Sequence, residues 1–76
     1  MSVNCPICEC IAEEKLPRVS DRIEIICPMC DRFGITPDAL AIGYYRLPED
    51  RHAALGHARI IAMRQMEIPL VTAGLF

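Results

Sequence analysis

Two Cys-Pro-x-Cys sequences constrain this chain more than any other feature. They are Cys5-Pro6-Ile7-Cys8 and Cys27-Pro28-Met29-Cys30, and 18 residues separate them. The two-residue spacing lets both sulfur atoms of a tight turn reach one metal ion, and the proline pre-sets the backbone for that turn. Two such turns can approach one tetrahedral ion from opposite sides of a hairpin. We therefore expect one Zn²⁺ per chain, bound by all four thiolates.

The length of the chain also argues for a metal. A domain of 76 residues has room for only one small core and usually needs a further source of stability. Zinc binding supplies about 10 kcal/mol or more, so we expect the metal-free chain to be disordered or molten. The sequence begins without a secretory signal, and its apolar stretches are shorter than the roughly 20 residues of a membrane-spanning helix. We expect a cytoplasmic protein with reduced thiols and no membrane contact.

Alternating polar and apolar residues flank the second cysteine pair, in 22–25 and 32–36, as is typical of half-buried strands. We expect these segments to pair as an antiparallel hairpin. Residues 11–18 are a weaker candidate for a third strand, because Pro17 cannot donate a backbone hydrogen bond and suits an edge or a strand end. A turn is expected at 19–21.

Helix signals begin after the second hairpin segment. Thr36 is a good capping residue before Pro37, which predicts a short helix over 37–45. A longer helix is predicted from Pro48 to about Met66, since acids follow Pro48 and Pro69 prevents continuation. The apolar residues 68–71 are expected to form a strand or an extended segment that packs back on the ribbon. The predicted fold is a small α+β metal-stabilised domain, with a ribbon over 1–37 and a helical extension over 38–76 packed as one domain.

The cysteine pairs resemble those of the zinc-ribbon family, in which two Cys-Pro-x-Cys turns, called knuckles, flank a small antiparallel sheet. The order Cys-Pro-x-Cys, Leu-Pro-Arg, Cys-Pro-x-Cys-x-Arg-aromatic and Ile-Thr is similar to a segment of uncharacterised bacterial and phage zinc-ribbon proteins. This resemblance covers about half of the chain and implies a metal and a fold, not a task. Family knuckles usually have glycine, at positive φ, where this chain has Glu9 and Asp31. Because Glu9 tolerates positive φ less readily, we expect a distorted first knuckle, which favours Cys10 as an alternative to Cys8.

Other interpretations of the cysteines stay open at this point. Iron uses the same four sulfur ligands as zinc, and one Cys-Pro-x-Cys pair is compatible with a redox dithiol or a disulfide. Two pairs at ribbon spacing favour a metal, and Cys10 is expected to be a partly buried free thiol. His52 and His57 are five residues apart, about 140° around a helix, so they do not form a two-histidine site. We predict no catalytic residues and no enzymatic activity.

The charge pattern disfavours nucleic acid as the main partner. The formal net charge is −2, and acids outnumber Lys and Arg up to Asp38. A nucleic-acid-binding ribbon is nevertheless the alternative function. Aromatic rings can stack on the bases of a single strand, and guanidinium groups beside them can bind its phosphates. The predicted contact set comprises Arg18, Arg22, Arg32, Tyr44, Tyr45 and Arg46.

The long helix predicts a protein partner instead. It is apolar on two sides, of which one can cover the ribbon while the other needs a partner or the folded-back tail. The residues proposed for a partner helix are Ala54, Ala58, Ile60, Ala62 and Met63. The preferred function is a non-enzymatic structural-zinc adaptor or modulator that self-associates or docks on a larger cytosolic complex, including phage-type modulation of a host complex. A redox dithiol protein using Cys5 and Cys8 ranks third.

Overall fold

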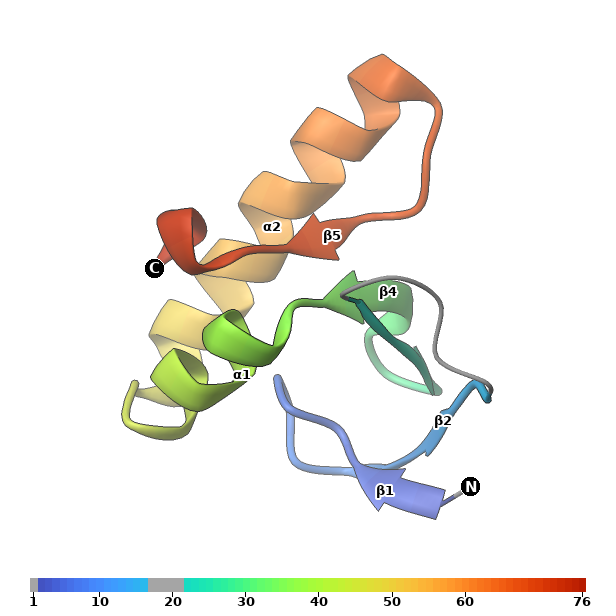
Figure 1. The fold of residues 1–76 in the computed structure, drawn as a ribbon, viewed down its shortest axis with the longest axis vertical. Helices are drawn as coiled ribbons and strands as arrows, with labels where there is room; N and C mark the ends of the chain where they lie inside the picture. The colour runs from blue at the N-terminus through green and yellow to red at the C-terminus, as the bar shows by residue number, and fades with distance from the viewer. Residues whose placement is uncertain (1, 17–21) are drawn as a thin grey trace.

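The computed structural model describes residues 2–16 and 22–76 (Figure 1). These residues form a small α+β fold with one sheet and two helices. The strands are β1 (Ser2–Asn4), β2 (Ile11–Glu14), β3 (Ile23–Cys27), β4 (Asp31–Ile35) and β5 (Leu70–Val71); the helices are α1 (Pro37–Tyr44) and α2 (Pro48–Gln65), followed after β5 by the 3₁₀ turn η1 (Ala73–Leu75).

One five-stranded sheet includes strands from both ends of the described chain. Its strand order is β1-β2-β3-β4-β5, and the first four strands pair antiparallel with their neighbours. Strand β5 pairs parallel to β4, with Ile35 opposite Val71. A parallel pair requires a long crossover, and α1 and α2 provide it. The C-terminal part of the chain therefore completes the sheet that the cysteine-bearing part begins.

The ribbon agrees with the sequence in one hairpin and differs in the other. The hairpin predicted around the second cysteine pair is present as β3 and β4. The third strand, predicted over 11–18, ends at Glu14, and Pro17 and the turn predicted at 19–21 lie outside the described residues. Strand β2 is not an edge strand, because β1 pairs with its outer side. Strand β1 was not predicted, since three residues are too few to establish a periodic pattern.

Both helices start at the predicted prolines, and each ends one residue before its expected end. The Thr36 hydroxyl caps α1 by accepting a hydrogen bond from the Ala39 N–H at 3.3 Å. A hydrogen bond with Thr36, and then one from the Ala39 N–H, hold the pKa of the Asp38 carboxyl below its ordinary value. The C-cap residue that follows α2 is Met66, which adopts the left-handed conformation with φ of 54°. Neither helix is long and apolar enough to cross a membrane.

The core lies between the sheet and the inner side of α2. Its largest fully buried side chains are Phe33, Ile7, Ile35, Leu55, Val71, Cys5 and Cys27. The burial corrects part of the predicted partner face, because Ala54, Ala58 and Ala62 lie inside the molecule. Their small side chains allow α2 to pack closely on its own chain, where it contacts β5 and η1. Ile60 and Met63 stay exposed, at 53% and 79%, so the folded-back tail does not cover them.

Candidate metal centre

The sheet topology brings the two cysteine pairs together. The first pair lies in the turn between β1 and β2, and the second lies in the turn between β3 and β4, where Cys27 is opposite Asp31. Strands β2 and β3 are antiparallel, with Glu13 opposite Ile26, so the start of β2 lies beside the end of β3. Both turns are consequently at the same end of the sheet.

The residue that follows each knuckle has a left-handed backbone conformation. Glu9 has a φ of 64° and Asp31 a φ of 61°, so each residue after a second cysteine has the positive φ expected of that position. The expected distortion of the first knuckle is absent in this respect. Two backbone hydrogen bonds close this turn: Glu9 N–H donates to the Cys5 carbonyl at 2.9 Å, and Cys5 N–H donates to the Cys10 carbonyl at 2.7 Å. These bonds hold Glu9 in a conformation that is otherwise unfavourable for a side chain with Cβ.

The four predicted ligands converge. The sulfur atoms of Cys5, Cys8, Cys27 and Cys30 all lie within 4.8 Å of one another, and the Cys8 and Cys27 sulfur atoms are 3.5 Å apart. Metal–sulfur bonds of about 2.3 Å in a regular tetrahedron place the sulfur atoms about 3.8 Å apart. All five cysteines are free thiols rather than disulfides. The donor set and its spacing therefore fit one tetrahedral metal ion, and four sulfur ligands suit zinc or iron.

Backbone N–H groups point at the sulfur atoms from within each knuckle. Met29 N–H donates to the Cys27 sulfur at 3.4 Å, the backbone N–H groups of Ile7 and Cys8 donate to Cys5, and that of Cys10 donates to Cys8. Such bonds stabilise thiolate charge where burial would otherwise penalise it. Three of the four clustered cysteines, Cys5, Cys27 and Cys30, are only 1–3% exposed, whereas Cys8 is half-buried. The site is thus enclosed, with Cys8 as its more accessible member.

The thiols do not share one acidity. Burial raises the pKa of Cys5 to about 11, although the backbone hydrogen bonds from Cys8 and Ile7 act in the opposite direction. Burial also acts to raise the pKa of Cys8, but the Cys10 N–H and hydrogen bonds from the other three clustered thiols outweigh it and lower this pKa to about 7. Burial and then the hydrogen bond with Cys8 raise the pKa of Cys30. Without a metal, Cys8 is therefore more readily ionised than Cys5 or Cys30, whereas a bound cation favours four thiolates.

Cys10 lies outside the group of four sulfur ligands. It is exposed, not partly buried as expected from the sequence, and its backbone N–H donates a hydrogen bond to Cys8. A side-chain hydrogen bond with Cys8 is the largest contribution that raises the pKa of the Cys10 thiol. The described residues therefore offer Cys8, rather than Cys10, as the fourth ligand of the cluster.

Two arginines of α2 support the knuckles, and neither was among the site residues predicted from the sequence. The Arg59 guanidinium donates to the Cys30 carbonyl at 2.8 Å. Arg51 donates to the Glu9 carboxylate at 3.3 Å and to the Gly43 carbonyl at 3.5 Å, and its Nε is buried without a partner among the described residues. A sequence signal for Arg51 exists, since it lies one turn before Leu55 on the buried side of α2. A charged residue in an apolar stripe needs a buried partner.

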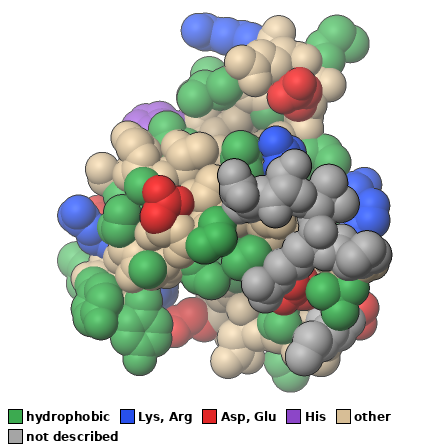
Figure 2. Space-filling model, viewed as in Figure 1, with side chains coloured by type: hydrophobic (Ala, Val, Ile, Leu, Met, Phe, Trp, Pro, Cys, Tyr) green, Lys and Arg blue, Asp and Glu red, His purple; other side chains and the backbone are tan. Residues whose placement is uncertain are grey.

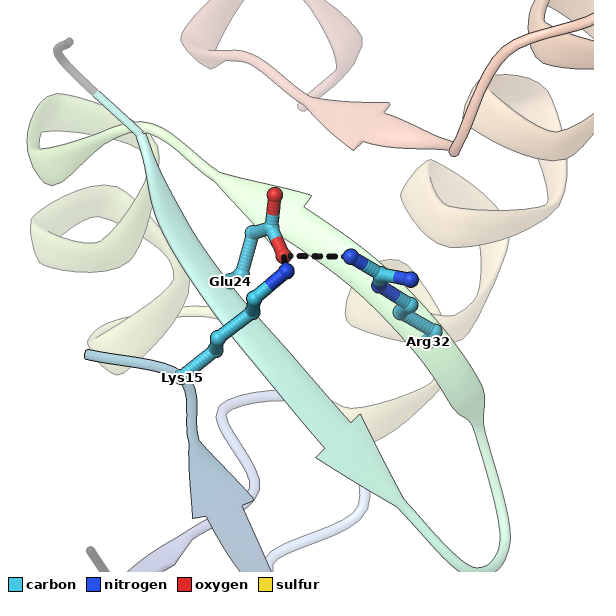
Figure 3. Close-up of polar contacts among 3 residues, drawn as sticks. All are labelled: Lys15, Glu24 and Arg32. Carbon is cyan, nitrogen blue, oxygen red and sulfur yellow. Dashed lines mark hydrogen bonds and ion pairs between the residues drawn. The ribbon is translucent and has the colours of Figure 1, made fainter. Parts of the chain in front are cut away.

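Among the residues that the structure describes, the predicted nucleic-acid contacts do not form one surface. On the sheet, the Glu24 carboxylate accepts a hydrogen bond from Arg32 at 3.0 Å and lies 3.8 Å from the Lys15 ammonium (Figure 3). The Arg32 guanidinium is therefore already paired with a carboxylate of its own chain. This hydrogen bond lowers the pKa of Glu24, as does the charge of Lys15. Arg22 lines a shallow groove beside the end of α2, and Arg18 lies outside the described residues.

The tyrosines of that set lie elsewhere. Tyr44 and Tyr45 are 81% and 86% exposed, and their rings meet edge to face with centroids 5.3 Å apart. Figure 2 shows hydrophobic side chains gathered at the lower left, over the connection between α1 and α2, where Arg46 is also exposed. Figure 1 places this connection well away from β4, which carries Arg32. The structure therefore keeps Tyr44, Tyr45 and Arg46 together and separates them from Arg32.

Comparison of the chain with protein-family models, with curated proteins and with solved structures gave no match. The assignment of a metal centre rests on the sulfur geometry alone, and the comparisons identify neither a family nor an activity.

Proposed function

We propose that this protein is a non-enzymatic adaptor or modulator whose fold is stabilised by one Zn²⁺ bound to Cys5, Cys8, Cys27 and Cys30. The observation that supports this proposal best is the enclosure of the sulfur cluster. Four thiolates complete the tetrahedral coordination of zinc, and three of the four residues are at most 3% exposed. Catalytic zinc sites instead have three protein ligands and keep a position open for water or substrate. A closed site of this kind serves the fold.

The outer side of α2 supports a role in protein contacts. Ile60 and Met63 expose most of their side chains on a helix whose opposite side is packed in the core. Apolar side chains that a small domain leaves uncovered on one helix face commonly mark a contact site. The proposed activity is therefore self-association or docking on a larger cytosolic complex, and modulation of a host complex by a phage-type protein is one form of it.

Native mass spectrometry of the protein purified without added metal tests the metal part of the proposal. We expect one zinc per chain, and we expect a strong chelator to abolish the far-UV circular dichroism of the folded protein together with the bound metal. A metal-free protein that keeps its circular dichroism after chelation would contradict the proposal and favour a redox dithiol. One iron per chain would retain the adaptor function but replace the ion.

Two alternatives have an observation in their favour. The exposed Tyr44 and Tyr45 beside Arg46 favour single-stranded nucleic acid as a ligand. That function predicts oligonucleotide binding that weakens steeply with salt and is lost in a Tyr44→Ala/Tyr45→Ala variant. The pKa of about 7 at Cys8 favours a redox role for Cys5 and Cys8. This third function predicts rapid alkylation of Cys8 in the protein as purified, whereas four-thiolate coordination predicts protection.

A further inference from the structure

The outer side of α2 carries a stripe of residues with the spacing of a helix–helix contact. Ala53, Gly56, Ile60 and Met63 follow one another at intervals of three, four and three residues, which places them on one side of the helix. We call these four residues the outer seam. It lies opposite the buried side formed by Ala54, Leu55, Ala58 and Ala62. The small residues available to a partner are thus Ala53 and Gly56 on the outer side of α2. The alanines expected from the sequence to contact a partner lie about half a turn away, on the buried side.

The outer seam is divided into a small half and a large half. Ala53 and Gly56 lie toward the start of α2, whereas Ile60 and Met63 lie toward its end. A Cβ added at Gly56 would meet no atom within 4 Å, so this position is an open notch in the helix surface. In an antiparallel pair of α2 helices centred between Gly56 and Ile60, each Ile60 faces Gly56 of the second copy and each Met63 faces Ala53. Large side chains then fill small positions, as close helix packing requires.

The charges beside the seam favour the same antiparallel arrangement. Glu49 and Asp50 lie in the first turn of α2, and Arg64 lies in its last turn. Antiparallel pairing brings the first turn of each helix next to the last turn of the other. Two symmetric contacts between Asp50 and Arg64 of different copies follow, each between opposite charges. Parallel pairing would instead gather the acids of both first turns at one end of the contact and both copies of Arg64 at the other end, and would pair Gly56 with Gly56.

We propose that the partner of the outer seam is a second copy of this chain, bound antiparallel through α2. This inference rests on the proposed function, because it names the partner of an adaptor. The contact is isologous, so one pair of surfaces closes a two-fold dimer. The seam covers about three helical turns. We expect a contact of this length to bury less than the roughly 1,200 Å² of a stable interface. We therefore expect a weak dimer, with a dissociation constant of about 10⁻⁵ to 10⁻⁴ M.

Sedimentation velocity of the metal-loaded protein, from about 10 µM to about 1 mM, measures this equilibrium. The informative variant is Gly56→Leu, whose side chain has space in the monomer but occupies the place of Ile60 from the second copy. We expect Gly56→Leu to remain monomeric throughout and to keep its metal and its circular dichroism. Gly74→Leu is the matched control, because a Cβ there also meets no atom within 4 Å while Gly74 lies in η1, away from the seam. We expect this control to dimerise like the unmodified protein.

A charge-reversal pair tests the orientation of the helices. Arg64→Glu places three acids at each end of the contact and should weaken dimerisation about tenfold. The double variant Asp50→Lys/Arg64→Glu restores opposite charges in the antiparallel pair and should recover most of that loss. Failure of the double variant to recover, or equally tight association of Gly56→Leu, would overturn the antiparallel seam. So would an unmodified protein that stays monomeric at the highest concentration.

Failure of the dimer inference can be distinguished from failure of the proposed structural-zinc function. A folded monomer that unfolds with loss of its zinc would remove the second-copy inference and leave the metal-stabilised adaptor intact. In that case another protein would have to cover the outer seam. A dimer that retains its fold after chelation would contradict the structural-zinc proposal while supporting the seam.

Discussion

The Arg59 guanidinium in the middle of α2 donates a hydrogen bond of 2.8 Å to the backbone carbonyl of Cys30. This bond ties the long helix directly to the second knuckle, 29 residues earlier in the chain. It also places a positive charge near a centre that becomes doubly negative when four thiolates bind a divalent ion. Helix α2 therefore contributes to the candidate metal centre as well as to the core.

Arg59→Ala should lower the stability of the metal-loaded protein by about 1–2 kcal/mol, because a hydrogen bond from a charged donor is lost. We also expect faster transfer of the metal to a competing chelator, since the Cys30 carbonyl and its turn lose their anchor. Urea denaturation and the chelation rate, both measured at low micromolar concentration, check these effects. Arg46→Ala, which removes an exposed arginine between the helices, is the control; a similar loss in that variant would contradict a specific role for Arg59.

Replacement of single cysteines should separate the ligands from the remaining thiol. Cys27→Ser removes a buried cysteine of the sulfur cluster and should abolish metal binding and unfold the domain, because the proposed structural zinc supplies free energy of folding. Cys10→Ser should leave the metal content and circular dichroism nearly unchanged, since Cys10 is exposed and outside the sulfur cluster. Equal effects of the two substitutions on metal content would mean that the ligands are wrongly assigned.

The residues that follow the knuckles offer a test of backbone strain. Asp31→Gly should raise stability by up to about 1 kcal/mol, because glycine adopts a φ of 61° without the steric cost of a Cβ. Glu9→Gly relieves the same kind of cost but removes the carboxylate that accepts from the buried Arg51. We therefore expect a smaller gain or a net loss at Glu9. Thermal denaturation of the two metal-loaded variants compares them, and a larger gain at Glu9 would contradict this account of Arg51.

The ion pair on the sheet predicts a small dependence of stability on pH. Arg32 holds the pKa of Glu24 below its ordinary value of 4.5, so folding favours the ionised carboxylate. This contribution is complete above pH of about 4.5 and is lost as the pH falls through the lower folded-state pKa. Because Arg32 is 44% exposed, the coupling energy should be only about 0.2–1 kcal/mol. A double-mutant cycle of Glu24→Gln and Arg32→Met at pH 7 measures it, and coupling above about 2 kcal/mol would contradict a solvent-screened pair.

Local sequence signals predicted most of the elements of this fold. The two Cys-Pro-x-Cys turns, the hairpin around the second turn and the proline starts of both helices depend on residues close together in sequence, so they could be derived without tertiary information. The short β1 carried too few residues for such a signal. The side of α2 that faces the core was also undetermined, since the helix is apolar on two sides and either could have packed against the sheet.

The sequence by itself determined that two cysteine pairs have the spacing of one metal site and where the helices would begin, because cysteine spacing and capping residues act within a few residues. Tertiary structure decided which thiol stays outside the cluster, which face of α2 is buried, and that Arg51 and Arg59 reach the knuckles. These outcomes depend on the register between β2 and β3 and on the close approach of three alanines to the core. Contacts between distant segments compete for the same small core, and only packing decides between them.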